Sequence, residues 1–134
     1  MCEVNHHLLK IVNDMGLDLI FTDMDRSGIY FAEEKVIFLS DKLLENNSDF
    51  EISHELGHCI KKHEELSAYY NATDYSRRKL EFEANRIAIE ILLFIWSNEY
   101  DFEREQLNAV KFMEYYNIPW NLENCVRESM LNYG

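Results

Sequence analysis

The sequence predicts an α+β domain in which a short three-stranded sheet, antiparallel or mixed, packs on two central helices and is followed by further helices. Two observations support this prediction. Three short apolar runs, each bounded by turn residues, lie between residues 17 and 39. On both sides of them, apolar residues recur at spacings of three and four, the period of a half-buried helix. With 134 residues, 47% of them hydrophobic, we expect one domain over residues 1–134.

The N-terminal part of the chain is predicted to pass from a helix into the sheet. Residues 3–15 carry an apolar stripe that includes Leu8 and Val12, and Gly16 follows as a helix stop. The runs predicted as strands cover residues 17–21, 29–31 and 35–39, with a turn-rich break at 23–28. Their order suggests a meander or small antiparallel sheet, followed by one helical turn at 41–46.

The rest of the chain is predicted to be mainly helical. Ser48 and Glu51 have the spacing of a capping box, so Ser48 is expected to open a helix that ends between residues 61 and 64. Residues 65–75 are polar and aromatic and predict a loop. Further helices are expected at 76–96, 101–116 and 121–131. The helix at 101–116 should turn four residues inward: Phe102, Leu107, Val110 and Met113.

Composition narrows the classes of function. The net charge of −12 disfavours direct contact with nucleic acid or an anionic membrane, although it is compatible with a basic protein partner. No apolar run is long enough to span a membrane, and the N-terminus lacks the pattern of a signal peptide. Three widely spaced cysteines suit free thiols in a reducing cytoplasm. We therefore expect a cytoplasmic protein.

The segment His54-Glu55-Leu56-Gly57-His58 is an H-E-x-x-H motif. Residues four apart on a helix lie about 40° from each other around its axis, so His54 and His58 can direct two imidazoles at one ion. Glu55 lies beside them without pointing at the ion, where a general base for a zinc-activated water is required. The motif predicts a zinc site with Glu55 as the catalytic base.

Tetrahedral zinc with two histidines and one water needs a further protein ligand. The segment Glu81-Phe82-Glu83-Ala84-Asn85 offers Glu81 or Glu83, which lie about 200° apart on a helical wheel and cannot both face one ion. We favour Glu81, because the apolar stripe of this helix lies nearer to it. The small Ala84 would let the helix approach the histidines, and Asn85 could hydrogen-bond the free nitrogen of one of them.

These two blocks resemble the ImmA/IrrE metallopeptidases, whose pattern is H-E-L-G-H followed by E-x-x-A-N/D-x-F-A-x-x-L-L. The order of predicted elements before and after the blocks is similar too. Two departures are Ile87 in place of the usual Phe, and Phe94-Ile95-Trp96 where relatives commonly have Met-Pro.

The resemblance implies a small gluzincin-like zincin fold with Zn²⁺ held by His54, His58 and Glu81. It also implies an endopeptidase of phage or mobile-element type that cleaves a helix-turn-helix repressor. The alternative is a catalytically weak zinc protein that binds and sequesters the repressor without cutting it. An oxyanion stabiliser is also needed, and spacing does not single one out among the candidates Tyr69, Tyr70, Tyr75, His63 and Arg77.

Overall fold

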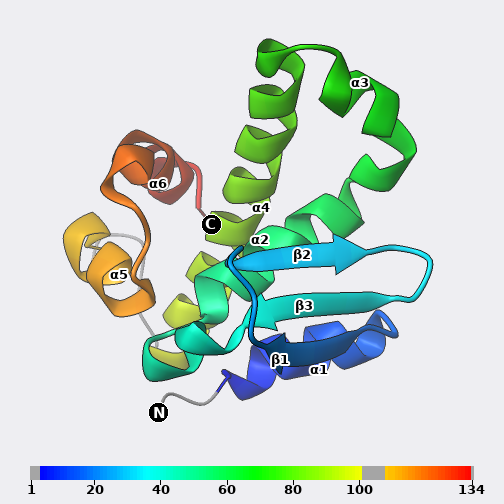
Figure 1. Ribbon diagram of the computed structural model, residues 1–134. Helices are drawn as coiled ribbons and strands as arrows, with labels where there is room; N and C mark the ends of the chain where they lie inside the picture. The colour runs from blue at the N-terminus through cyan, green and yellow to red at the C-terminus, as the bar shows by residue number, and fades with distance from the viewer. Residues whose placement is uncertain (1–3, 101–107, 134) are drawn as a thin grey trace.

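The structure is a computed structural model that describes residues 4–100 and 108–133, and it has the predicted α+β class (Figure 1). The helices and strands follow the chain in this order: α1 His6–Asp14, β1 Asp18–Thr22, β2 Gly28–Phe31, β3 Val36–Ser40, α2 Asp49–Ile60, α3 Ser67–Ala72, α4 Asp74–Tyr100, α5 Ala109–Tyr116 and α6 Glu123–Leu131. Short 3-10 helices occur at Asp41–Glu45, His63–Leu66 and Trp120–Leu122.

The sheet is mixed, with strand order β1-β3-β2. β2 and β3 pair antiparallel through a tight turn, whereas β1 pairs with β3 in parallel, with Asp18 opposite Val36. The mixed sheet that the sequence allowed is confirmed, whereas the suggested meander or small antiparallel sheet is wrong, because β3 lies between the other two strands and pairs with β1 in parallel. Alternation along a strand says which face is buried, but it does not say which neighbour a strand takes.

The sheet positions the H-E-x-x-H helix through a shared core. α1 and α2 contribute apolar side chains that pack with those of β3, and Ile95 of α4 completes this cluster. The fully or almost fully buried members are Leu8, Val12, Leu17, Ile37, Leu39, Ile52, Leu56 and Ile95. Because Ile52 and Leu56 face this core, the histidines of α2 face the other way.

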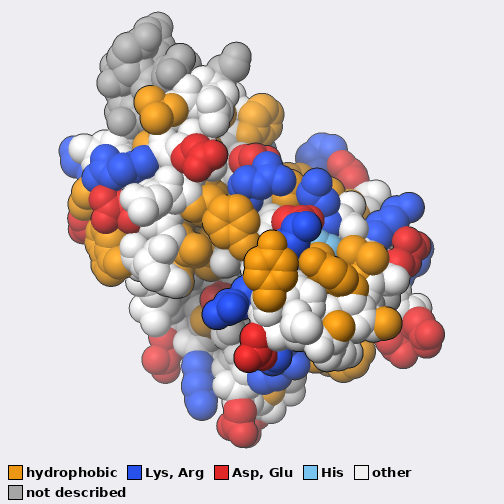
Figure 2. All heavy atoms as spheres, turned by 90° about the horizontal axis from the view of Figure 1, so that it is seen from above, with side chains coloured by type: hydrophobic (Ala, Val, Ile, Leu, Met, Phe, Trp, Pro, Cys, Tyr) orange, Lys and Arg blue, Asp and Glu red, His pale blue; other side chains and the backbone are white. Residues whose placement is uncertain are grey.

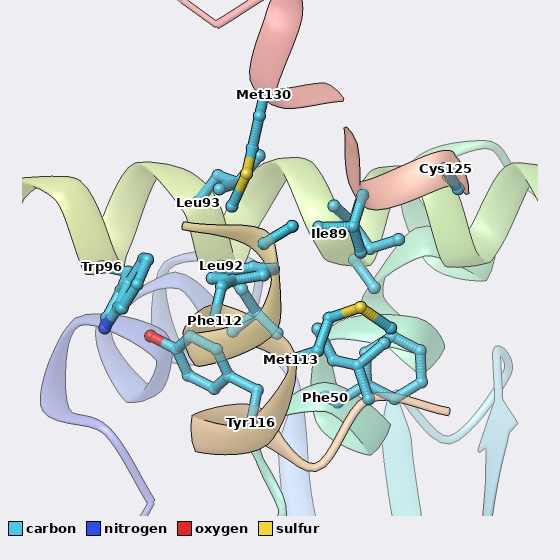
Figure 3. Packing of buried hydrophobic residues seen from close by; sticks show 14 residues of the cluster. Phe50, Ile89, Leu92, Leu93, Trp96, Phe112, Met113, Tyr116, Cys125 and Met130 are labelled. Atoms are coloured by element: carbon cyan, nitrogen blue, oxygen red, sulfur yellow. The ribbon is translucent and has the colours of Figure 1, made fainter. Parts of the chain in front are cut away.

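A second core joins α4 to the C-terminal helices (Figure 3). Phe112, Met113 and Tyr116 of α5 pack against Leu92 and neighbouring residues of α4, and α6 adds Cys125, Val126 and Met130. The long α4 therefore contributes to both hydrophobic clusters.

Several sequence expectations need correction. Ser48 precedes α2 as predicted but makes no side-chain cap; instead the Asn47 side chain accepts from the Asp49 N–H at 2.9 Å. The expected loop at 65–75 contains the helix α3. Its sequence shows no apolar stripe, so periodicity did not predict a helix; packing against α4 stabilises it.

The C-terminal predictions are partly confirmed. Helix α5 covers the second half of the expected 101–116 helix; Phe102 and Leu107 lie outside the described residues. Met113 is buried as predicted, whereas Val110 is 39% exposed because Ala109 and Phe112 form the inward face. The expected final helix is confirmed as a 3-10 turn followed by α6.

Two further observations concern the surface. Acidic and basic side chains are interspersed on the face shown in Figure 2, with only a small area of histidine visible between them. Within residues 4–100 and 108–133, none of the helices combines the length and the hydropathy needed to cross a bilayer.

Candidate metal centre

The two central helices bring three predicted ligands together. Nε2 of His54 lies 2.9 Å from Oε2 of Glu81, and Nε2 of His58 lies 3.3 Å from the same oxygen. The two imidazole rings, one helical turn apart on α2, lie edge to face with centroids 4.8 Å apart. One ligand atom from each of these three residues falls within 4.8 Å of the other two, so they can all reach a single ion.

A glycine on α2 allows this convergence. Gly57 lies against the backbone of Ala84 on α4, and a Cβ added to Gly57 would come within 2.6 Å of the Ala84 carbonyl oxygen. Only a residue without a side chain permits so close an approach. The sequence interpretation noted that Ala84 is small but missed the larger contribution of Gly57.

Asn85 makes the contact expected of it. Its Oδ1 lies 2.7 Å from Nδ1 of His54. Because an amide oxygen only accepts hydrogen bonds, His54 carries a proton on Nδ1, and its Nε2 points toward Glu81. Without a further proton, this nitrogen and the Glu81 carboxylate are both hydrogen-bond acceptors. Two acceptors 2.9 Å apart require a positive group between them, either a second imidazole proton or a cation. The donor set therefore fits a divalent metal ion.

The electrostatics of the site agree with this interpretation. Burial would raise the pKa of Glu81, but hydrogen bonds from His54 and His58 outweigh it and hold the pKa well below its usual range. Burial would lower the pKa of His54, but the Glu81 hydrogen bond and the nearby carboxylates outweigh it and raise the pKa. The carboxylate thus strongly favours positive charge beside the two imidazoles, and a bound cation supplies such charge.

Glu55 lies beside this group and lines the same cleft. It is only 7% exposed, and burial raises its pKa above that of an ordinary glutamate. A Cβ added to Gly28 would lie 3.5 Å from Oε2 of Glu55, so β2 approaches the carboxylate closely. Gly28, Arg26 and Ser27 line a cleft of about 390 Å³ together with Glu51, Glu55 and the three candidate ligands.

The two glutamates of α4 take different partners. Glu81 meets both histidines of the motif, as favoured from the sequence, whereas Oε2 of Glu83 lies 3.4 Å from Nε2 of His63. The other nitrogen of His63, Nδ1, lies 2.7 Å from Nδ1 of His58. Burial lowers the pKa of His63. This connection was not foreseen, because five-residue spacing does not place two side chains together on a regular helix.

The structure also separates the candidate oxyanion stabilisers. Tyr70 donates to Oε1 of Glu81 at 3.0 Å, so it holds the carboxylate in place, and Arg77 pairs with Asp74. Tyr75 is 69% exposed. The residues that line the cleft from the turn before β2, Arg26 and Ser27, were missed. Their only sequence signal is their position directly before the glycine and aromatic residues of β2.

Residues 12–120 match the IrrE N-terminal-like domain, a peptidase family, and this segment contains α2, the candidate ligands and Glu55. Comparison with curated proteins and with solved structures gave no match. The matched segment covers most of the 134 residues, including both motif blocks on which the resemblance was recognised. The chain therefore belongs to the family of IrrE N-terminal-like peptidase domains.

Proposed function

We propose that this chain is a zinc-dependent endopeptidase that cleaves a helix-turn-helix repressor of a phage or other mobile element. The observation that carries the proposal is the convergence of His54, His58 and Glu81 beside the buried Glu55 in an open cleft. Bound zinc would supply the Lewis acidity that activates water and polarises a carbonyl.

The chain's own residues account for the proton transfers. Glu55 accepts a proton from the attacking water as the new C–O bond forms, and it delivers that proton to the departing amine as the C–N bond breaks. The raised pKa of Glu55 suits both steps, because the carboxyl group then gains and loses a proton more readily near neutral pH. Asn85 holds His54 in the orientation that directs Nε2 to the metal.

The edge of the sheet supports a peptide as substrate. β2 is an edge strand in the order β1-β3-β2, and the cleft lies at its Gly28 end. An extended peptide can add to an exposed sheet edge through main-chain hydrogen bonds. A peptide laid along β2 would pass next to Glu55, and this arrangement favours endopeptidase activity on an extended segment.

The family resemblance and the charge of the chain both favour a helix-turn-helix repressor as the substrate. The ImmA/IrrE resemblance implies it, since relatives of that type cut helix-turn-helix repressors. The net charge of −12 also suits a partner that is basic because it binds DNA.

The test is to incubate the purified, zinc-loaded chain with the helix-turn-helix repressor encoded beside its gene, and to identify fragments by mass spectrometry. We expect cleavage at one or a few peptide bonds. Glu55→Gln should still bind zinc but cleave roughly 10²–10⁴-fold more slowly, because the amide cannot accept the proton. Glu114→Gln, a matched loss of charge on the exposed face of α5, should cleave at the normal rate.

Two results would contradict the proposal. A stable complex with an intact repressor would identify the chain as a sequestering protein. Equal cleavage by Glu55→Gln would remove the general-base role.

A further inference from the structure

His63 lies next to His58 of the candidate metal centre, although neither motif block contains it. It is 6% exposed and begins the short 3-10 helix that follows α2. Lys62, directly before it, has a left-handed backbone with φ 54°. A non-glycine residue in this region costs about 1 kcal/mol or more, and here it turns the chain back so that His63 returns to His58.

The hydrogen-bonding capacities of these groups define one arrangement of protons. To bind a metal through Nε2, His58 must carry its proton on Nδ1. That N–H can then donate to Nδ1 of His63, 2.7 Å away. His63 must in turn carry its own proton on Nε2, where Oε2 of Glu83 lies 3.4 Å away and accepts it. In this arrangement the Nδ1–H of His58 and the Nε2–H of His63 each face a hydrogen-bond acceptor.

We propose that His63 and Glu83 are positioning residues that fix the tautomer and orientation of His58 for metal binding. This inference rests on the proposed metal-dependent function, because it assigns His58 as a ligand through Nε2. Neither residue belongs to the group of three whose ligand atoms can reach one ion.

In each of the two motif histidines, Nδ1 then has a hydrogen-bond partner that fixes the orientation of the ring. Asn85 holds Nδ1 of His54 directly, and His63 with Glu83 holds Nδ1 of His58. Both supports depend on α4, through residues 83 and 85, which follow the candidate ligand at 81 on the same helix. α4 therefore supplies one ligand and also contributes to the orientation of the other two.

Zinc affinity provides the first test, measured by competition with a chromophoric chelator on the full chain. Removing a hydrogen-bond partner of a metal ligand typically weakens binding about 10–100-fold. We expect His63→Ala to lose affinity in this range and Glu83→Gln to lose a smaller part of it. His63→Gln should recover affinity relative to His63→Ala, because its amide oxygen can accept the His58 N–H. Glu65→Gln, an exposed carboxylate in the same 3-10 helix, should bind zinc normally.

The second test reads the tautomers directly, from imidazole ¹⁵N chemical shifts of the zinc-loaded protein. We expect a protonated Nδ1 on His58 and a protonated Nε2 on His63. A purely structural role for His63 would not require this pattern. The opposite tautomer of His63, or wild-type zinc affinity in both His63→Ala and Glu83→Gln, would overturn the inference. If the wild-type chain binds no zinc, the proposed function itself fails, so the two failures are distinguishable.

Discussion

The contact between Gly57 and Ala84 makes a quantitative prediction about the metal centre. In a helix that packs against nothing, replacing glycine with alanine stabilises by about 1 kcal/mol. At position 57 the added Cβ would lie 2.6 Å from the Ala84 oxygen and 2.9 Å from its Cα. Ordinary contact begins at 3.4 Å, so α2 and α4 must separate by roughly 0.8 Å.

This separation should reverse the sign of the substitution. Overpacking against rigid backbone costs up to about 3 kcal/mol, so the net loss for Gly57→Ala is about 2 kcal/mol. For a domain of this size that corresponds to a fall in Tm of roughly 8 °C. The helices also carry the candidate ligands on either side of this contact, and metal–ligand distances tolerate only about 0.2 Å. Zinc affinity should therefore fall at least about tenfold.

Urea unfolding of the metal-free chain and chelator competition measure the two effects separately. The double variant Gly57→Ala/Ala84→Gly tests whether the clash is with the backbone of Ala84. Replacing Ala84 with glycine removes only its side chain and leaves the crowded backbone atoms in place. We expect no rescue. A Gly57→Ala chain as stable as the wild type, with unchanged zinc affinity, would refute the claim that this contact sets the helix separation.

Three other substitutions test local features by equilibrium unfolding. Ser53→Ala should stabilise by about 1 kcal/mol, because the buried Ser53 hydroxyl lacks a hydrogen-bond partner among the described residues; a loss of stability would contradict this. Lys35→Gly should gain about 0.5–1 kcal/mol, since Lys35 has φ 55° in the β2–β3 turn, and an unchanged midpoint would show no strain there. Burial raises the pKa of Asp49 despite the Asn5 N–H, with Glu99 adding to the rise, so its ionised form destabilises the fold. The advantage of Asp49→Asn over the wild type should therefore grow as the pH rises above 3.8 and level off once Asp49 is ionised in the folded chain, with no such advantage below 3.8; a pH-independent difference would exclude this cause.

The sequence predicted the local structure well, because periodicity and motif spacing are local properties. The strands and most helices occur where apolar spacing placed them, and helical geometry alone brought His54 and His58 to one face. The choice of Glu81 over Glu83 also agrees with the observed contacts. In each case one element's own pattern was sufficient.

The features that the sequence did not predict depend on contacts between different helices and strands. α3 has no apolar stripe of its own, and its helix packs on α4 with Tyr70 bonded to Glu81. The link between His58 and His63 depends on the left-handed Lys62, and lysine gives no sequence signal for that conformation. Strand order likewise depends on how the sheet meets α1 and α2, which alternation of residues does not report.

The strand order β1-β3-β2 has a consequence for the path of folding. The central strand, β3, is the last of the three strands in the sequence. Its antiparallel hairpin with β2 needs only local contacts, whereas its pairing with β1 must close a longer loop. We expect the hairpin to form early and β1 to dock onto it later, so Ile29→Val should give a higher φ-value than Leu19→Ala. The wall of the cleft nearest Glu55 would then exist before α4 arrives with the final ligand.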